Sequence, residues 1–286
     1  MRWLATLVLV CCASPAIAQD RYFDSGGARV RYLDEGRGPP IVLIHGFTGT
    51  IERSWINTGV LSDLARDYRV VALDLRGHGH SDKPHDATAY EEIGADVIRL
   101  LDHLKIEQAH AVGYSLGGII LAKLLVTHPA RFRSAVLGGA AYRRSRGEES
   151  DRAAEAAAKE IEAGIYRALI VSTAPTDEPP PSEAFIRLRS EIISRESDVQ
   201  AHAALMRARR ALLVSDAEIA GVRVPTLAVV GSADPALPRV QAMRKRWPGL
   251  EVEVVPGAAH PTVHERGVPR HAAFVAAIRR HIAAAR

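Results

Sequence analysis

The chain has 286 residues, of which 47% are hydrophobic and 24% are charged, and its formal net charge at pH 7 is +4. This is ordinary composition for a globular protein. The arginines are scattered among acidic residues and form no nucleic-acid-binding motif, so we expect no nucleic acid partner. The length allows a large hydrophobic core around one sheet, without a metal or a disulfide to stabilise it.

Residues 1–18 have the pattern of a secretory signal peptide. Arg2 provides the positive charge, residues 4–12 are apolar, and Ala16 and Ala18 occupy the −3 and −1 positions before a cleavage site. The pattern predicts cleavage after Ala18 and export to the periplasm or the medium. The apolar run is too short for a stable membrane span, although an uncleaved anchor is the alternative. Both cysteines lie in this segment, so the mature chain has none and suits an oxidising compartment.

Six short apolar runs predict strands that are buried on both faces, as in a parallel sheet. The runs alternate with helical patterns, and this alternation indicates right-handed strand–helix–strand units. The predicted fold class is therefore α/β, with a doubly wound, mostly parallel sheet. The six runs are Ile41–Ile44, Tyr68–Leu73, Ala109–Val112, Ala135–Leu137, Thr226–Val230 and Glu251–Val255.

Three helices are expected between and after these strands. Thr88 and Glu91 have the spacing of a capping box, and the apolar residues that follow recur at helical spacing. A second helix is predicted over Ser115–Thr127, where two early glycines permit close approach to the sheet. The third covers Val268–Ala284 at the end of the chain.

Residues 142–216 interrupt the alternation because they contain no strand pattern. Two stretches rich in Ala, Glu and Arg, Glu148–Leu169 and Ser182–Val214, instead predict helices. A helical insertion between two sheet strands would form a lid over the strand ends, and a decoration with no role at the site is the alternative. The predicted organisation is a signal peptide over 1–18, a core domain in two parts over 19–141 and 217–286, and a helical lid over 142–216.

The clearest chemical motif is Gly113-Tyr114-Ser115-Leu116-Gly117, a G-x-S-x-G sequence. It lies between a predicted strand and a predicted helix, which is the context of a nucleophile elbow that projects a serine Oγ above the sheet edge. A plain glycine-rich turn is the alternative interpretation. The motif nevertheless predicts Ser115 as a nucleophile.

A serine hydroxyl needs a base to accept its proton, and the base needs an acid to orient it. His260 lies in a loop just after the last predicted strand, and Asp234 directly follows the Thr226–Val230 strand. Strand ends are where a doubly wound sheet assembles its site. We therefore predict His260 as general base and Asp234 as its acid. A surface histidine and a turn-capping aspartate remain the alternatives.

Acyl transfer also needs two N–H donors for the oxyanion of the tetrahedral intermediate. Leu116 follows the nucleophile directly and supplies the first backbone N–H. Phe47, in the loop after the Ile41–Ile44 strand, is the best candidate for the second. His45 in the same loop is expected to stabilise the loop rather than act as a base.

The chain from about residue 29 to residue 282 resembles the α/β-hydrolase superfamily, in particular its lid-bearing serine esterases and cofactor-free haloperoxidase-like members. The order Ser, Asp, His matches that fold. The resemblance implies that the segment from Asp74 to Ser81 is a structural turn. It rests on five motifs in the family's order, His45-Gly46-Phe47, Asp74–Ser81, Gly113–Gly118, Gly231–Pro238 and Gly257–His260.

The predicted function is hydrolysis of a small to medium carboxylic ester through an acyl-Ser115 intermediate, with a small-molecule substrate and no cofactor. Lactone, amide, carbon–carbon bond or peracid chemistry on the same triad stays open, as does a non-catalytic ligand-binding protein. The resemblance argues against epoxide and alkyl halide hydrolysis, since those relatives have Asp where Ser115 stands. Carbon–carbon bond hydrolases rank lower because their Gly-rich sequence after His-Gly is replaced here by residues 47–50.

Overall fold

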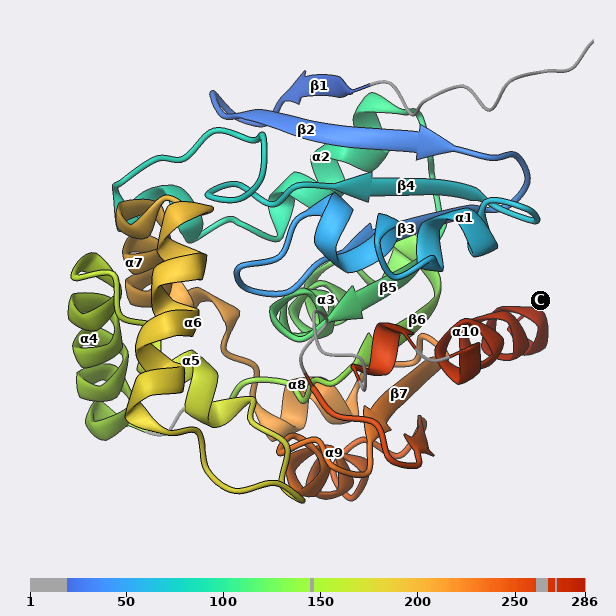
Figure 1. Ribbon diagram of the computed structural model, residues 1–286. Coiled ribbons are helices and arrows are strands. Elements are labelled where there is room, and N and C mark those ends of the chain that lie inside the picture. The colour runs from blue at the N-terminus through green and yellow to red at the C-terminus, as the bar shows by residue number, and fades with distance from the viewer. Residues whose placement is uncertain (1–19, 145–146, 261–266, 271, 286) are drawn as a thin grey trace, which may run out of the picture.

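The computed structural model describes residues 20–144, 147–260, 267–270 and 272–285. The predicted signal peptide lies outside the described residues, so its cleavage stays a prediction. An eight-stranded sheet in the order β1-β2-β4-β3-β5-β6-β7-β8 forms the centre of the molecule (Figure 1). The strands are β1 (Arg21–Asp24), β2 (Arg29–Glu35), β3 (Pro40–Ile44), β4 (Arg69–Leu73), β5 (Ala109–Tyr114), β6 (Phe132–Gly138), β7 (Thr226–Gly231) and β8 (Leu250–Val255).

The sheet is parallel from β4 to β8 in its spatial order, whereas the pairs β1–β2 and β2–β4 are antiparallel. The doubly wound, mostly parallel sheet predicted from the sequence is thus confirmed. All six apolar runs form strands. β1 and β2 were not predicted, because charged side chains interrupt the apolar residues of Arg29–Glu35, so that no continuous apolar run marks the strand.

Helices cover both faces of the sheet, and each face has its own hydrophobic core. Alternate side chains of β3 show this division, since Ile41 and Leu43 join the core under α1 and α10, whereas Val42 and Ile44 join the core under α2, α3 and α9. The helices are α1 (Val60–Leu64), α2 (Ala95–His103), α3 (Leu116–Thr127), α4 (Glu148–Glu162), α5 (Arg167–Ser172), α6 (Glu183–Arg195), α7 (Val199–Arg207), α8 (Asp216–Ala220), α9 (Leu237–Arg244) and α10 (Ala272–Ala284), with short turns η1 (Glu52–Ile56), η2 (Ala87–Tyr90), η3 (Pro129–Arg131), η4 (Ala208–Leu212) and η5 (Val268–Arg270).

The predicted capping box at Thr88 is wrong. Residues Ala87–Tyr90 form a single 3₁₀ turn, whose cap is Asp86, and its carboxylate accepts a hydrogen bond from the Thr88 N–H at 2.9 Å. Helix α2 begins only at Ala95. An aspartate one position upstream of a short turn competes for the same N–H groups, so the box spacing was misleading.

The helical insertion, residues 142–216, carries α4 to α7 as a group beside one end of the sheet (Figure 1). It has a small core of its own, which includes Ile161, Tyr166 and Ile193. The two predicted helical stretches are each divided. Gly164, with φ of 75°, lies between α4 and α5, and Asp198 caps the start of α7.

Candidate active site

Ser115 stands at the turn from β5 to α3 in a backbone conformation that few non-glycine residues adopt. Its φ is 52° and its ψ is −113°. The flanking glycines allow this turn to pack closely, because a Cβ on Gly117 would lie 2.0 Å from the Ile44 carbonyl oxygen. A Cβ on Gly113 would lie 2.4 Å from the Gly117 carbonyl oxygen. Both glycines of the motif are therefore required by backbone contacts at the elbow.

His260 lies within hydrogen-bonding distance of both Ser115 and Asp234. Its Nε2 is 2.9 Å from the Ser115 Oγ, and its Nδ1 is 2.9 Å from the Asp234 Oδ2. The three residues follow β5, β8 and β7, whose carboxyl ends meet at one edge of the sheet. The structure therefore brings together the three side chains that the sequence singled out, in the arrangement of a nucleophile, a base and an orienting acid.

Two further contacts fix the acid and the base. The Asp234 carboxylate is fully buried and accepts a hydrogen bond from the Ala236 N–H at 2.7 Å. The Tyr114 hydroxyl donates to the His260 carbonyl oxygen at 2.5 Å, and burial raises the pKa of Tyr114 well above its ordinary value. Tyr114 thus stays a protonated donor at neutral pH and holds the backbone of the histidine loop.

Gly139 packs directly behind the acid and the base. Its φ is 56°, and a Cβ there would lie 3.1 Å from both the Asp234 Oδ2 and the His260 Nδ1. Sequence reasoning missed Gly139 and Tyr114 as supporting residues. Tyr114 occupies a variable position of G-x-S-x-G, and the partner of its hydroxyl lies 146 residues further along the chain. No local signal in the sequence could have revealed that contact.

The two residues predicted to supply the oxyanion donors both line the cavity that contains Ser115 and His260. Leu116 begins α3, and Phe47 is in the loop after β3. That loop passes against the nucleophile, because a Cβ on Gly46 would lie 3.1 Å from the Ser115 Cβ. The partial positive charge of a helix N-terminus adds to the favourable field at this point.

The residues expected to be structural have backbone partners. His45 is buried, and its Nε2 accepts a hydrogen bond from the Leu75 N–H at 3.0 Å. The buried Asp74 carboxylate accepts hydrogen bonds from the N–H groups of Ile51 and His80, both at 2.9 Å. These bonds tie the loops after β3 and β4 to each other, as a structural turn would.

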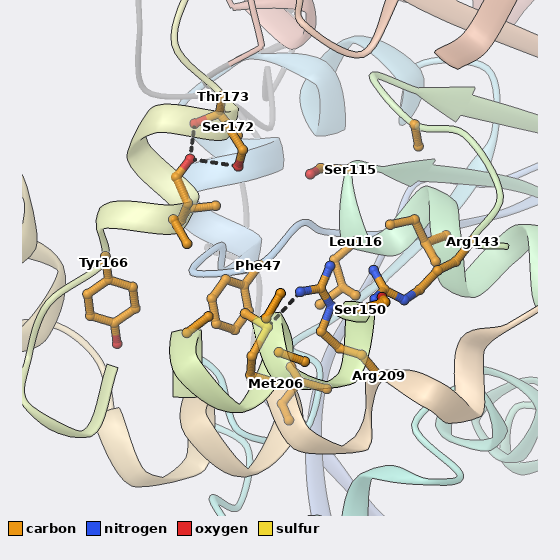
Figure 2. Close-up of a pocket in the computed structure, with 18 of the residues that line it drawn as sticks. Phe47, Ser115, Leu116, Arg143, Ser150, Tyr166, Ser172, Thr173, Met206 and Arg209 are labelled. Carbon is orange, nitrogen blue, oxygen red and sulfur yellow. Dashed lines mark hydrogen bonds between the residues drawn. The ribbon is translucent and has the colours of Figure 1, made fainter. Parts of the chain in front are cut away.

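The cavity has a volume of about 440 Å³, within the range of small-molecule sites. Figure 2 shows the Ser115 hydroxyl, the Phe47 ring and the Leu116 side chain at this space, with Met206 and Tyr166 of the insertion on the side of Phe47 away from Ser115. Small and apolar side chains of α4, including Ala157 and Ile161, line another wall. The cavity therefore lies between the core and the helical insertion.

Three buried histidines lie where the insertion meets the core. The ring of His78, from the loop after β4, is 4.6 Å from the ring of His202 on α7 and 5.2 Å from that of His45. Burial lowers the pKa of His202 to about 3 and holds the pKa values of His45 and His78 below their ordinary range. The His202 Nδ1 lies 2.9 Å from the Tyr166 hydroxyl. The three rings are therefore neutral at neutral pH.

In the described part of the chain, no three His, Cys, Asp or Glu side chains are grouped so that they could hold a metal ion. None of its helices has both the length and the apolar character that crossing a membrane requires.

Comparison with known proteins identifies the family. The family profile of the alpha/beta hydrolase fold matches residues 39–179. The chain is 32% identical over 202 residues to 3-oxoadipate enol-lactonase 1 of Acinetobacter baylyi, and this match covers 68% of the chain and 72% of that relative. The chain belongs to the α/β-hydrolase family. This family carries the elbow serine in the context found here.

Other relatives match shorter parts of the chain. The 2-hydroxymuconate semialdehyde hydrolase of a Pseudomonas species is 39% identical over 130 residues, which are 45% of each chain. The matched segment covers 45% of the length of this relative, and it covers 32% and 29% of the lengths of two others. The solved enol-lactonase of Burkholderia xenovorans has a TM-score of 0.72 at 22% identity, over 92% of this chain and all of that one, and so shares the fold.

Proposed function

We propose that the protein hydrolyses small to medium carboxylic esters through an acyl intermediate on Ser115. The observation that carries the proposal is the continuous hydrogen-bonded line from Ser115 through His260 to Asp234 at the wall of a cavity. A buried carboxylate on Nδ1 leaves Nε2 free to accept the serine proton. A protein that only bound ligands would gain nothing from this arrangement.

The proposed reaction has two halves. The Ser115 Oγ attacks the carbonyl carbon while His260 Nε2 takes the hydroxyl proton, and Asp234 stabilises the imidazolium that forms. The N–H groups of Phe47 and Leu116 hold the oxyanion. The intermediate then collapses, His260 gives the proton to the leaving alcohol, and water releases the acid from the serine by the same steps in reverse order.

The test is a turnover screen on p-nitrophenyl esters of graded acyl length, with fluorophosphonate labelling of the active serine. We expect ester turnover and labelling by the native protein. Ser115→Ala should lower kcat/KM by at least about 10⁴-fold, with an unchanged melting temperature, because Ala fits the same backbone. A variant that kept most of its activity, or that was still labelled, would show that Ser115 is not the nucleophile.

Lactone hydrolysis is a second candidate, because the similarity to an enol-lactonase covers 68% of the chain. The same serine, base and acid would open a ring ester, with the leaving alkoxide held on the same molecule. Adding five- and six-membered lactones to the screen separates the two candidates. A kcat/KM for lactones well above that for every open-chain ester would favour the lactonase.

The helical insertion, residues 142–216, is proposed to act as a lid that shapes the substrate pocket. Its support is that α4, α5 and η4 contribute side chains to the lining of the cavity that contains Ser115.

Export is proposed on the N-terminal sequence pattern alone. Expression of the full chain should give a protein that begins at Gln19 in the periplasm or the medium. Intact-mass analysis of each fraction checks this, and recovery in the membrane fraction with residues 1–18 still attached would contradict it.

A further inference from the structure

The cavity is unevenly charged. Among the described residues, four arginines line it and Glu160 is the one carboxylate that does. Arg144 at its rim is paired with Asp216, with a distance of 2.8 Å between the Nε and a carboxylate oxygen. The other three lining arginines are Arg143, Arg209 and Arg239.

Of these three, Arg209 is only partly exposed and Arg239 is exposed to solvent. Arg209 lies on η4, and its half-buried guanidinium points into the cavity beside Leu116 (Figure 2). Its Nη1 donates to the Met206 Sδ at 2.8 Å. A thioether is a weak and uncharged acceptor. In the described part of the chain, no carboxylate lies within ion-pair distance of this guanidinium.

The groups nearest to Arg209 increase its charge imbalance. Burial and, to a smaller extent, the positive charges of Arg143 and Arg239 together lower the pKa of Arg209 to about 10. At neutral pH the group is still protonated. A half-buried cation that faces two like charges is unfavourable until an anion reaches it.

Two arginines close to Arg209 in the sequence have carboxylate partners. Arg207, two positions before Arg209, pairs with Glu155 and Glu162. Arg210, the next residue, is exposed and pairs with Asp151 at 3.2 Å. Arg207 and Arg210 are therefore each paired with carboxylates, whereas Arg209, which lies between them in the sequence and lines the cavity, is not.

We propose that the cavity takes substrates that carry a carboxylate in addition to the ester, and that Arg209 binds this carboxylate. The inference rests on the proposed ester hydrolysis, of which it names the substrate class. A guanidinium pairs with a carboxylate through two parallel N–H···O bonds, and this fork suits a planar anion. The class comprises monoesters of short dicarboxylic acids and lactones with a carboxylate side chain.

Water is the only co-substrate that hydrolysis of such a monoester needs. Ser115 displaces the alcohol from the ester carbonyl, and water then displaces the serine. The products are one alcohol and one dicarboxylic acid. The carboxylate held by Arg209 takes no part in bond breaking, so its contribution is to bind and orient the substrate.

The test compares two substrates of equal acyl length, mono-p-nitrophenyl adipate and p-nitrophenyl hexanoate, which differ in a terminal carboxylate. For the native protein we expect kcat/KM to be at least about 10-fold higher for the adipate monoester, as a charged hydrogen bond would give. Arg209→Gln should reduce this ratio at least about 10-fold. Arg209→Lys, which keeps the charge but loses the fork, should give an intermediate ratio.

Arg210→Gln is the matched control. It removes the same charge from the neighbouring position of the same turn, outside the cavity, so the substrate ratio should stay as in the native protein. A native ratio near one, or an Arg209→Gln variant with an unchanged ratio, would overturn the proposal. Preference for an analogue with a phosphonate in place of the carboxylate would overturn the choice of carboxylate.

A binding measurement separates this inference from the proposed function. Calorimetry with the Ser115→Ala protein should detect adipate, and adding Arg209→Gln should weaken its Kd at least about 10-fold. Such binding, together with a native protein that cleaves no ester in the screen, would support the anion site and contradict ester hydrolysis. Ester turnover without binding of adipate would support hydrolysis and contradict the anion site.

Discussion

The sheet core and the helical insertion meet at one cavity but are built by different means. In the core, backbone geometry positions the reactive groups, because Ser115, Asp234 and His260 each follow a strand and glycines allow the loops to approach closely. In the insertion, the helices have a small core of their own, and side chains such as alanines and arginines form the part of the cavity lining that the insertion supplies. The comparison suggests that the core sets the reaction and the insertion sets which molecule undergoes it.

The largest effect that tests this division is expected from a change of the acid in the core. Asp234→Asn keeps the shape of the side chain but removes the charge that stabilises the imidazolium of His260. We expect kcat to fall at least about 10²-fold, since the same change in another serine hydrolase costs about 10⁴-fold. The melting temperature should change little. Steady-state kinetics and thermal unfolding of the purified variant measure both effects.

Asp216→Asn provides the comparison for that variant. Asp216 begins α8, where its carboxylate accepts a hydrogen bond from Tyr142 and pairs with Arg144 and Arg246. Its removal should affect kcat less than about 10-fold, because these contacts support structure outside the proton path. If Asp216→Asn lost more activity than Asp234→Asn, the acid would have to be reassigned.

A smaller effect is expected where the two regions join. His202 has a pKa near 3 in the folded protein and about 6.5 when unfolded, so the unfolded chain binds more protons between these values. Its contribution to stability is therefore complete above pH 6.5 and declines as the pH falls toward 3. From pH 6.5 to pH 5 this one group should cost about 2 kcal/mol of unfolding free energy.

Urea unfolding at pH 7 and pH 5 measures this loss. His202→Asn cannot take up a proton, and its amide oxygen can still accept the Tyr166 hydroxyl, so the variant should lose about 2 kcal/mol less than the native protein between the two pH values. His128→Asn, at an exposed position, should lose as much as the native protein does. Equal losses in all three proteins would show that His202 does not contribute to acid sensitivity.

The division between core and insertion also explains what the sequence could predict. The buried strands were predictable because β3 and its neighbours are continuous apolar runs, and residues directly after such strands meet at one edge. Ser115, Asp234 and His260 were found in this way. Arg143 and Arg209 were missed as a pair, because they are far apart in the sequence, and the two ends of the insertion meet only through tertiary structure, at the bridge between Arg143 and Leu213. No periodicity marks which arginine of an exposed-looking helix turns inward.

The Tyr114 hydrogen bond has a mechanical consequence. Tyr114 is the chain neighbour of Ser115, and its hydroxyl holds the carbonyl of His260. The nucleophile and the base are therefore anchored to the same point of β5, and a displacement of this strand carries both groups along together. Thermal motion of the sheet should vary the distance from either group to the substrate more than the distance over which the proton passes between them.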